Sequence, residues 1–240
     1  MTTHFDRVGA AQVVLDLWRS ALAPTVRRWS LVVSAPDLLE VTHDEMAVYD
    51  GGGALAPFLA VQAVDRGIDP QAVVGPLADA VRPVPGEVPL TSATDALLAL
   101  VGGPRAVNER LRRTAYRTRV RPTGATVLPA EHAEMLAALA GNPAYDAVRT
   151  ALAADAPWGL AAWVSSETVL WHVQAWTATT RHGGAVLALP DGAELAVHCF
   201  TEVEPAPLTL ADPTYAAMGR AFALTLRELG LGGLVSAPGL

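Results

Sequence analysis

A stretch of alternating residues between positions 158 and 203 constrains the fold of this chain most strongly. The odd positions from Val169 to Ala175, and again from Ala193 to Val203, are mostly apolar. A period of two places such side chains on one face of a β-strand. Turn-forming residues interrupt the alternation at 165–167, 182–184 and 190–192. We therefore predict a four-stranded antiparallel meander in this part of the chain.

The rest of the chain has the start and stop signals of helices. Asp212-Pro213 supplies an N-cap and a proline for the first helical turn of a C-terminal amphipathic helix. The middle of the chain, from about Ala54 to 154, contains several helices with glycine stops at Gly67 and Gly102-Gly103. Short apolar runs at 29–33 and 46–49 predict N-terminal strands.

The order of these elements lacks a regular strand–helix–strand alternation. It predicts an α+β fold with a C-terminal four-stranded antiparallel meander, short N-terminal strands, a helical middle and a packed C-terminal helix. The chain has 240 residues, of which 51% are hydrophobic and 17% charged, so it can bury a sizeable core. We predict a single α+β domain over residues 1–240, with a sub-domain boundary near 82–90 as the alternative.

Composition also excludes several partners and locations. The net charge of −7 argues against nucleic acid as a partner. No apolar segment is long enough to span a membrane, and the N-terminal residues lack the apolar region of a secretory signal. We therefore expect a cytoplasmic protein without a membrane association.

The absence of lysine excludes two kinds of site. All 17 basic residues are arginine, so the chain has neither a Schiff-base lysine nor the lysine of a P-loop. The triple glycine at 51–53 fits no nucleotide-binding spacing and predicts a flexible turn between a strand and a helix. The single cysteine, Cys199, excludes an intrachain disulfide and a multi-cysteine zinc site. We expect no cofactor.

Histidines and tryptophans of the meander are the candidates for a small-molecule site. His172 and His198 lie on predicted strands, opposite the apolar face. Trp171 and Trp176 differ in parity, so they should lie on opposite faces of a sheet that is covered on both sides. Core packing explains the tryptophans. The alternative is a pocket that these aromatic rings line, with a histidine as the acid–base group.

Arginines are concentrated between positions 105 and 121, where seven of them accompany one acid, Glu109. Arg117, Arg119 and Arg121 alternate along a predicted strand and would form a cationic face. Together with Arg113 they would form a docking surface for an acidic partner or an anionic ligand. The alternative is a solvated face that the excess acids of the chain balance.

Residues 130–229 run helix, helix, β-meander and amphipathic helix. This order resembles the C-terminal half of the EspG-type chaperones of actinobacterial type VII secretion. The resemblance implies a cofactor-free cytosolic protein that holds secreted helical-hairpin substrates. It rests on element order and composition without a sequence motif, so we transfer no residue roles from it.

Two functions from different classes follow. The first is a non-catalytic cytosolic protein-binding or chaperone-like protein, such as a secretion accessory, with a protein partner at the arginine face. The alternative is a small-molecule enzyme or ligand-binding protein of bacterial specialised metabolism. Its pocket would consist of Trp171, His172, Trp176 and His198, with a histidine as the acid–base group.

We predict that the purified protein contains no stoichiometric metal. Glu194, His198 and Glu202 share one strand face, but their four-residue spacing corresponds to about 13 Å along a strand, too far to share one ion. Elemental analysis should therefore find no metal in molar proportion to the protein. About one zinc or iron per chain would contradict this prediction.

Overall fold

A computed structural model describes residues 7–35, 38–81, 91–121, 124–153, 159–209 and 211–236. Its main feature is an antiparallel sheet in the order β2-β1-β8-β7-β6. The strands are β1 (Arg28–Ala35), β2 (Leu39–His43), β6 (Val169–Trp176), β7 (Thr180–Ala188) and β8 (Glu194–Glu202). A smaller sheet in the order β3-β5-β4 consists of β3 (Tyr49–Asp50), β4 (Arg119–Arg121) and β5 (Gly124–Val127).

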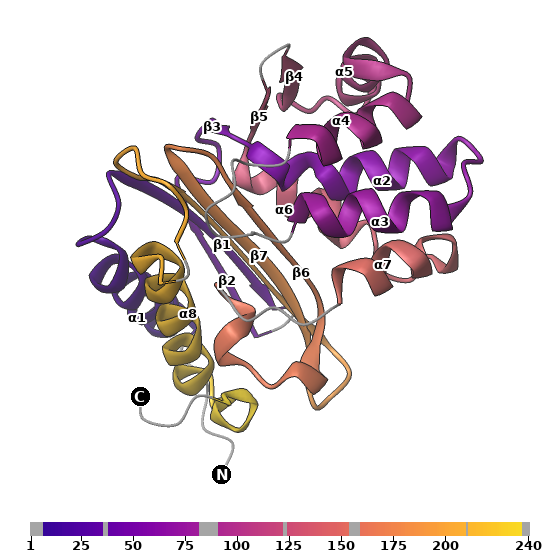
Figure 1. The fold of residues 1–240 in the computed structure, drawn as a ribbon. Helices are drawn as coiled ribbons and strands as arrows, with labels where there is room; N and C mark the ends of the chain where they lie inside the picture. The colour runs from indigo at the N-terminus through magenta and orange to yellow at the C-terminus, as the bar shows by residue number, and fades with distance from the viewer. Residues whose placement is uncertain are drawn as a thin grey trace.

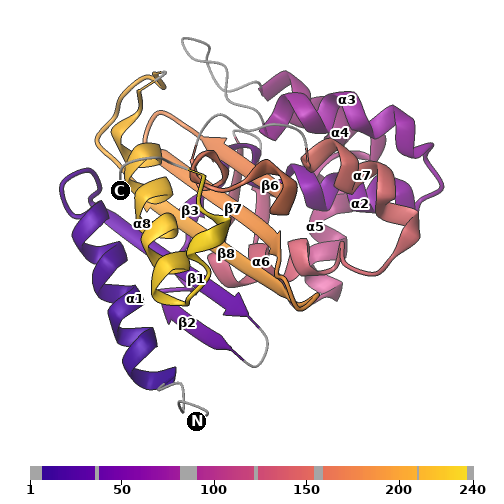
Figure 2. The same ribbon diagram turned by 90° about the horizontal axis from the view of Figure 1, so that it is seen from below.

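Helices cover both faces of the larger sheet (Figures 1 and 2). One face packs against α1 (Arg7–Leu22) and α8 (Pro213–Glu228). The opposite face packs against a helical layer, which comprises α2 (Ala56–Asp65), α3 (Pro70–Val81), α4 (Thr91–Leu100), α5 (Gly103–Arg113), α6 (Pro129–Ala137) and α7 (Asp146–Leu152). Short 3₁₀ helices connect these elements, at η1 (Gly52–Leu55), η2 (Pro143–Tyr145), η3 (Ala161–Trp163), η4 (Ser166–Thr168) and η5 (Gly232–Leu234).

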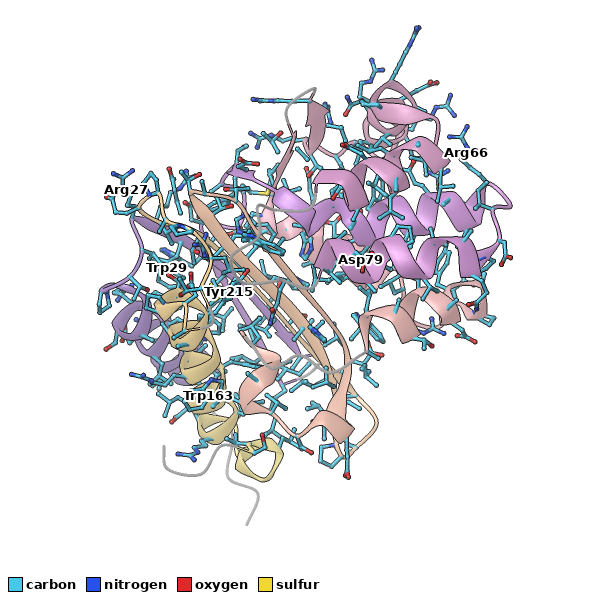
Figure 3. All side chains as sticks on the ribbon, in the orientation of Figure 1. Arg27, Trp29, Arg66, Asp79, Trp163 and Tyr215 are labelled. Carbon is cyan, nitrogen blue, oxygen red and sulfur yellow. The ribbon has the colours of Figure 1, made fainter. Side chains whose placement is uncertain are left out.

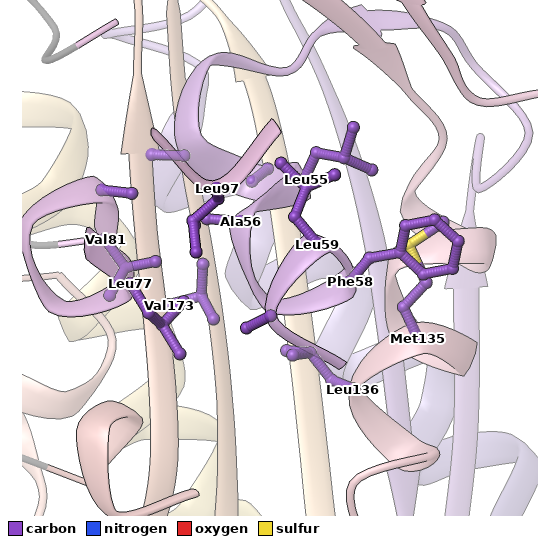
Figure 4. Packing of buried hydrophobic residues seen from close by; sticks show 14 of the residues in the cluster. Leu55, Ala56, Phe58, Leu59, Leu77, Val81, Leu97, Met135, Leu136 and Val173 are labelled. Carbon is purple, nitrogen blue, oxygen red and sulfur yellow. The ribbon is translucent and has the colours of Figure 1, made fainter. Parts of the chain in front are cut away.

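Each face of the sheet has its own apolar core. On the helical-layer side, Leu59 of α2, Leu77 of α3 and Val173 of β6 belong to one buried cluster (Figure 4). On the other side, Met218 and Phe222 of α8 are fully buried against the sheet. As predicted, Trp171 and Trp176 belong to different clusters, because successive side chains of β6 point to opposite faces of the sheet.

A buried ion pair fixes the start of α8. Asp212 caps the helix by accepting hydrogen bonds from the backbone amides of Thr214 and Tyr215, at 3.0 and 3.3 Å. Its other carboxylate oxygen lies 2.8 Å from Nε of Arg181 in β7, and both side chains are buried. A buried charge is tolerated where a partner and further hydrogen bonds compensate its lost hydration. The pair therefore ties α8 to the sheet.

The predicted α+β fold with a mainly antiparallel sheet is confirmed, and the details of the meander differ. Residues 182–184 lie inside β7, and the turn before this strand is at 177–179. Gly183 and Gly184 are therefore strand residues, whose missing side chains make room for Leu160 and His198. The segment before β6 forms η3 and η4 in place of a strand. The fourth strand beside the meander is the N-terminal β1, which pairs with β8.

Two further predictions concern boundaries and membranes. The stretch 82–90, which we named as an alternative domain boundary, lies outside the described residues. The single-domain assignment thus stays a prediction. Within the part of the chain that the structure describes, no helix has both the length and the apolar character to cross a membrane.

The triple glycine forms a closely packed turn between β3 and α2, in contrast to the flexible turn we predicted. Gly52 has a φ of +48°, a region that favours glycine. A Cβ atom at this position would lie 2.5 Å from the carbonyl oxygen of Trp176 in β6. A Cβ atom on Gly53 would collide with the carbonyl oxygen of Ala80. The absence of side chains thus lets this segment, residues 50–53, which we call the glycine turn, lie directly on β6.

We predict that Gly53→Ala destabilises the protein by about 1–3 kcal/mol, the usual cost of overpacking a filled site. Gly75→Ala is the matched control, because Gly75 lies in α3 with open space around its Cβ position. There, alanine should leave stability unchanged or raise it by about 0.5–1 kcal/mol. Urea unfolding of both variants measures the difference. Equal stabilities would show that the glycine turn is not tightly packed.

Candidate functional site

Three buried histidines surround Phe200 where the larger sheet meets the helical layer. They are His132 of α6, His182 of β7 and His198 of β8, and each is at most 2% exposed. We call these three residues the histidine cluster. Histidine is less often fully buried than aliphatic residues, so three such side chains in one place require an explanation.

Strand register brings two of the histidines to the same face of the sheet. His182 pairs with Phe200, and Gly184 pairs with His198, so all four positions face the helical layer. A Cβ atom on Gly184 would lie 2.9 Å from Nδ1 of His198. Glycine at this position therefore leaves room for the imidazole rings.

The third histidine comes from the buried side of α6. This helix starts with Pro129 at its first position, and His132 is buried together with Met135 and Leu136. Its Nδ1 atom lies 3.1 Å from Nδ1 of His198, within hydrogen-bond distance. One of the two rings must donate this bond and the other must accept it.

Two contacts fix the ring of His182. The ring stacks on Phe200, with centroids 4.2 Å apart and an interplanar angle of 25°. Its Nε2 atom lies 2.6 Å from the backbone carbonyl oxygen of Asp50 in the glycine turn. A carbonyl oxygen can only accept, so Nε2 carries the proton and the neutral ring has its lone pair on Nδ1.

Two buried ring nitrogens of the histidine cluster make no hydrogen bond of good geometry to the described residues, although backbone groups of Ala54 and Arg181 lie close enough to raise the pKa of His132 and His182 slightly against the effect of burial. The two nitrogens are Nε2 of His132 and Nδ1 of His182. Most buried polar atoms in proteins have a partner, and an exception suggests a bound water, an ion or a catalytic role. These two atoms are therefore unsatisfied polar groups in the interior of the described structure.

The cluster is neutral at pH 7. Burial lowers the pKa of His182 to about 4 and that of His198 to about 3. Burial, and secondarily the neighbouring His198, holds the pKa of His132 well below its usual range. A neutral imidazole can accept a proton, whereas an imidazolium cannot.

Tyr49 of β3 lies beside the cluster. Its ring contacts His182 edge-on at 5.7 Å, and its hydroxyl lies 2.8 Å from the hydroxyl of Ser30. Burial raises the pKa of Tyr49 to about 12. The phenol thus stays protonated and is a hydrogen-bond donor at neutral pH.

Within the described ranges, no group of three or more histidine, cysteine, aspartate and glutamate side chains is placed to hold a metal ion. Our prediction of a metal-free protein remains to be measured.

The four residues of the sequence-predicted pocket do not converge on one place. Trp171 and His198 lie on the face of the sheet that meets the helical layer. Trp176 belongs to the opposite core. His172 pairs with Ala185, a residue of that same opposite core. Of the four, only His198 belongs to the histidine cluster. The pairing register of β7 and β8 is the feature that would have placed His182 beside His198 in the histidine cluster.

The arginines occupy a different part of the molecule. Arg119 and Arg121 belong to β4, and Arg117 precedes this strand. Arg117 and Arg121 are exposed, and the residues between them alternate in burial. The buried carboxylate of Glu131 accepts hydrogen bonds from the backbone amides of Arg117 and Thr118, at 2.5 and 2.7 Å. The fourth arginine, Arg113, ends α5 and pairs with Glu109.

The overall fold resembles that of solved β-lactamases. A β-lactamase from Xanthomonas campestris matches with a TM-score of 0.70 and 16% identity, over 92% of this chain and 98% of that one. A class A β-lactamase from Bacteroides cellulosilyticus matches with a TM-score of 0.72 and 12% identity, over 92% and 98%. One from Mycobacterium abscessus has a TM-score of 0.71 and 14% identity, over 90% and 99%. No protein-family model and no curated protein matches the sequence.

This likeness corrects the first function that we inferred from the sequence. The non-catalytic, protein-binding and chaperone-like interpretation is wrong, because the matched structures have a hydrolase fold over nearly their whole length. The order of elements in residues 130–229 does not include the N-terminal strands. In the structure, β1 and β2 complete the same sheet.

The sequence lacks the motifs of class A β-lactamase chemistry. These enzymes carry S-x-x-K, S-D-N and K-T-G motifs, with the serine as nucleophile. A chain without lysine cannot contain the first or the third, and Ser-Asp-Asn does not occur in it. The fold is thus shared, and the serine–lysine machinery is not.

We predict that histidine burial makes the free energy of unfolding fall as the pH drops from about 6.5 to about 4. In the unfolded chain each histidine binds a proton near its usual pKa of about 6.5, whereas folded His182 does so near 4 and His198 near 3. In this window the unfolded state binds more protons, so stability increases with pH. Once the pH is below the pKa that a ring has in the folded protein, that ring no longer contributes to the dependence of stability on pH.

Urea unfolding at several pH values tests this dependence. His198→Gln should make the slope of stability against pH shallower. Phe200→Leu is the matched control, because it changes packing in the same place without removing a titrating group. Its stability should be lower at every pH with the slope retained. Identical slopes in the wild type and His198→Gln would contradict the prediction.

Proposed function

We propose that this protein is an enzyme that acts on a small molecule and uses a histidine of the histidine cluster as its acid–base group. The likeness to solved β-lactamases over about nine-tenths of the chain supports a small-molecule substrate. The buried nitrogen Nδ1 of His182, which makes no hydrogen bond of good geometry within the described part of the chain, is the observation that carries the proposal.

His182 is the base in this proposal. The carbonyl oxygen of Asp50 fixes its tautomer and orientation through Nε2, and the stacking on Phe200 fixes the plane of the ring. In many enzymes a third group orients the catalytic base in the same way. Here the carbonyl oxygen of Asp50 is that group. The lone pair on Nδ1 is then free to accept a proton from a water molecule or a substrate hydroxyl.

The proposed reaction class is hydrolysis of an activated carboxylic acid derivative. Water attacks the carbonyl carbon while its proton passes to Nδ1 of His182. The tetrahedral intermediate then expels its leaving group, which takes up the proton from the imidazolium ring. This sequence needs neither a serine nucleophile nor a lysine, and it is therefore compatible with a chain that contains no lysine.

A cytoplasmic location is part of the proposal. Its support is the single buried thiol of Cys199, since proteins of oxidising compartments more often contain disulfides. Fractionation of host cells tests it.

We predict that the wild-type protein hydrolyses at least one member of a panel of phenyl esters, lactones and a chromogenic cephalosporin faster than buffer does. His182→Gln should lower this rate by about 10²–10⁴-fold, the usual contribution of a positioned general base. His43→Gln is the matched control, because His43 lies in β2 outside the histidine cluster. Its rate should equal that of the wild type.

Intact-protein mass spectrometry with a penicillin complements the rates. Direct attack by water leaves the protein mass unchanged. A covalent acyl adduct, or equal rates in the wild type and His182→Gln, would contradict the proposed mechanism.

A further inference from the structure

A pocket of about 250 Å³ lies between α2 and α5, apart from the histidine cluster. It is lined by Gln62, Arg66, Ala106, Glu109, Arg110 and Arg113. The pocket is at the C-terminal end of α2, whereas the glycine turn precedes its N-terminal end. Ten helical residues separate the two, a length of about 15 Å. Figure 3 shows Arg66 at the outer edge of the helical layer, far from Trp163 and Tyr215.

Gln62 contributes a hydrogen-bond donor that has no partner. Its side chain is only 5% exposed, and its Nε2 atom is buried without an acceptor among the described residues. A buried amide without a partner costs free energy, and a ligand oxygen in the pocket would remove this cost. Because Gln62 also lines the pocket, a small rotation of its side-chain amide would present this buried donor to an acceptor there.

Arg66 has no acidic partner among the described residues. Its Nη1 atom donates to the carbonyl oxygen of Val101. A Cβ atom on Gly102 would lie 3.2 Å from this same Nη1, so the glycine makes room for the guanidinium group. A guanidinium group has five N–H donors, and this single hydrogen bond leaves most of them available to a ligand.

The two other guanidinium groups are already oriented by acids. Arg110 lies 3.1 Å from the carboxylate of Asp65, which also accepts a 2.7 Å hydrogen bond from Tyr145. Arg113 pairs with Glu109 at 2.5 Å. Three guanidinium groups thus face two carboxylates, and one positive charge remains uncompensated.

We infer that this pocket is a binding site for a small organic anion. One carboxylate or phosphate group would accept hydrogen bonds from the guanidinium of Arg66, and a second acceptor atom would bind Nε2 of Gln62. Planar guanidinium groups bind such oxyanions through two parallel hydrogen bonds. The volume of about 250 Å³ suits a small anion, because pockets for drug-sized molecules usually have about 300–1,000 Å³.

The inference also refines the arginine face that the sequence indicated. Of the four arginines in that prediction, only Arg113 lines the pocket. Gln62 lies in α2 and Arg66 directly follows this helix, about fifty positions before Arg113 in the chain. The site is independent of the proposed hydrolysis, since none of its residues belongs to the histidine cluster.

Titration of ¹⁵N-labelled protein with benzoate, citrate and inorganic phosphate tests the inference. At least one of these anions should shift the side-chain amide signal of Gln62 in a saturable manner. Benzoate and citrate report binding through a carboxylate, and phosphate reports binding through a phosphoryl group. Arg66→Ala should weaken the binding about tenfold, as the loss of a charged hydrogen-bond partner implies. Gln62→Leu should weaken it as well.

Arg112→Ala is the matched control. Arg112 is an exposed arginine of α5, the helix that carries Arg110 and Arg113, and it does not line the pocket, so its loss should leave the affinity unchanged. Since Arg66 is also exposed, Arg66→Ala decides the question even if Gln62→Leu does not fold. The inference is wrong if no anion gives a saturable shift, or if Arg112→Ala weakens binding as much as Arg66→Ala.

Discussion

The close contact between the glycine turn and β6 is the constraint on which the rest of this structure depends. It lets the backbone at Gly52 approach the carbonyl oxygen of Trp176, and it brings the carbonyl oxygen of Asp50 within hydrogen-bond distance of His182. The same turn leads directly into α2, the helix that carries Gln62 and is followed by Arg66, and both residues line the anion pocket. A side chain at Gly52 would collide with β6, and one at Gly53 would collide with the backbone of α3.

The sequence predicted most of the elements and little of the site. Helix boundaries such as Asp212-Pro213 and Gly67 could be found because capping is local chemistry. His182-Gly183-Gly184 forms part of a strand and not the predicted turn, because glycine in a strand can also mark a close approach of another group. That close approach depends on β8 and α6, which are distant in the sequence. The partners of β1 and the convergence of His132 with His198 likewise depend on tertiary contacts that no local pattern reveals.

Fold and chemistry are separate in this protein. The chain matches class A β-lactamase structures over nearly its whole length, yet it contains no lysine for an S-x-x-K or K-T-G motif. One fold can carry different reactions, because function depends on the residues of the site. In the proposed account, neutral imidazoles take the place of the serine–lysine machinery, because burial lowers their pKa. Exposed arginines of the helical layer bind an anion at a separate site.

The central claim is that His182 is a neutral, oriented base with its lone pair on Nδ1. Nitrogen NMR of protein labelled with ¹⁵N-histidine measures this directly, since protonated and unprotonated ring nitrogens have distinct shifts. The account predicts that, as the pH falls from 7 to about 5, the His182 ring stays neutral with its proton on Nε2, because burial lowers its pKa to about 4. A His182 ring that carries its proton on Nδ1, or that titrates near the usual histidine pKa of about 6.5, would contradict it.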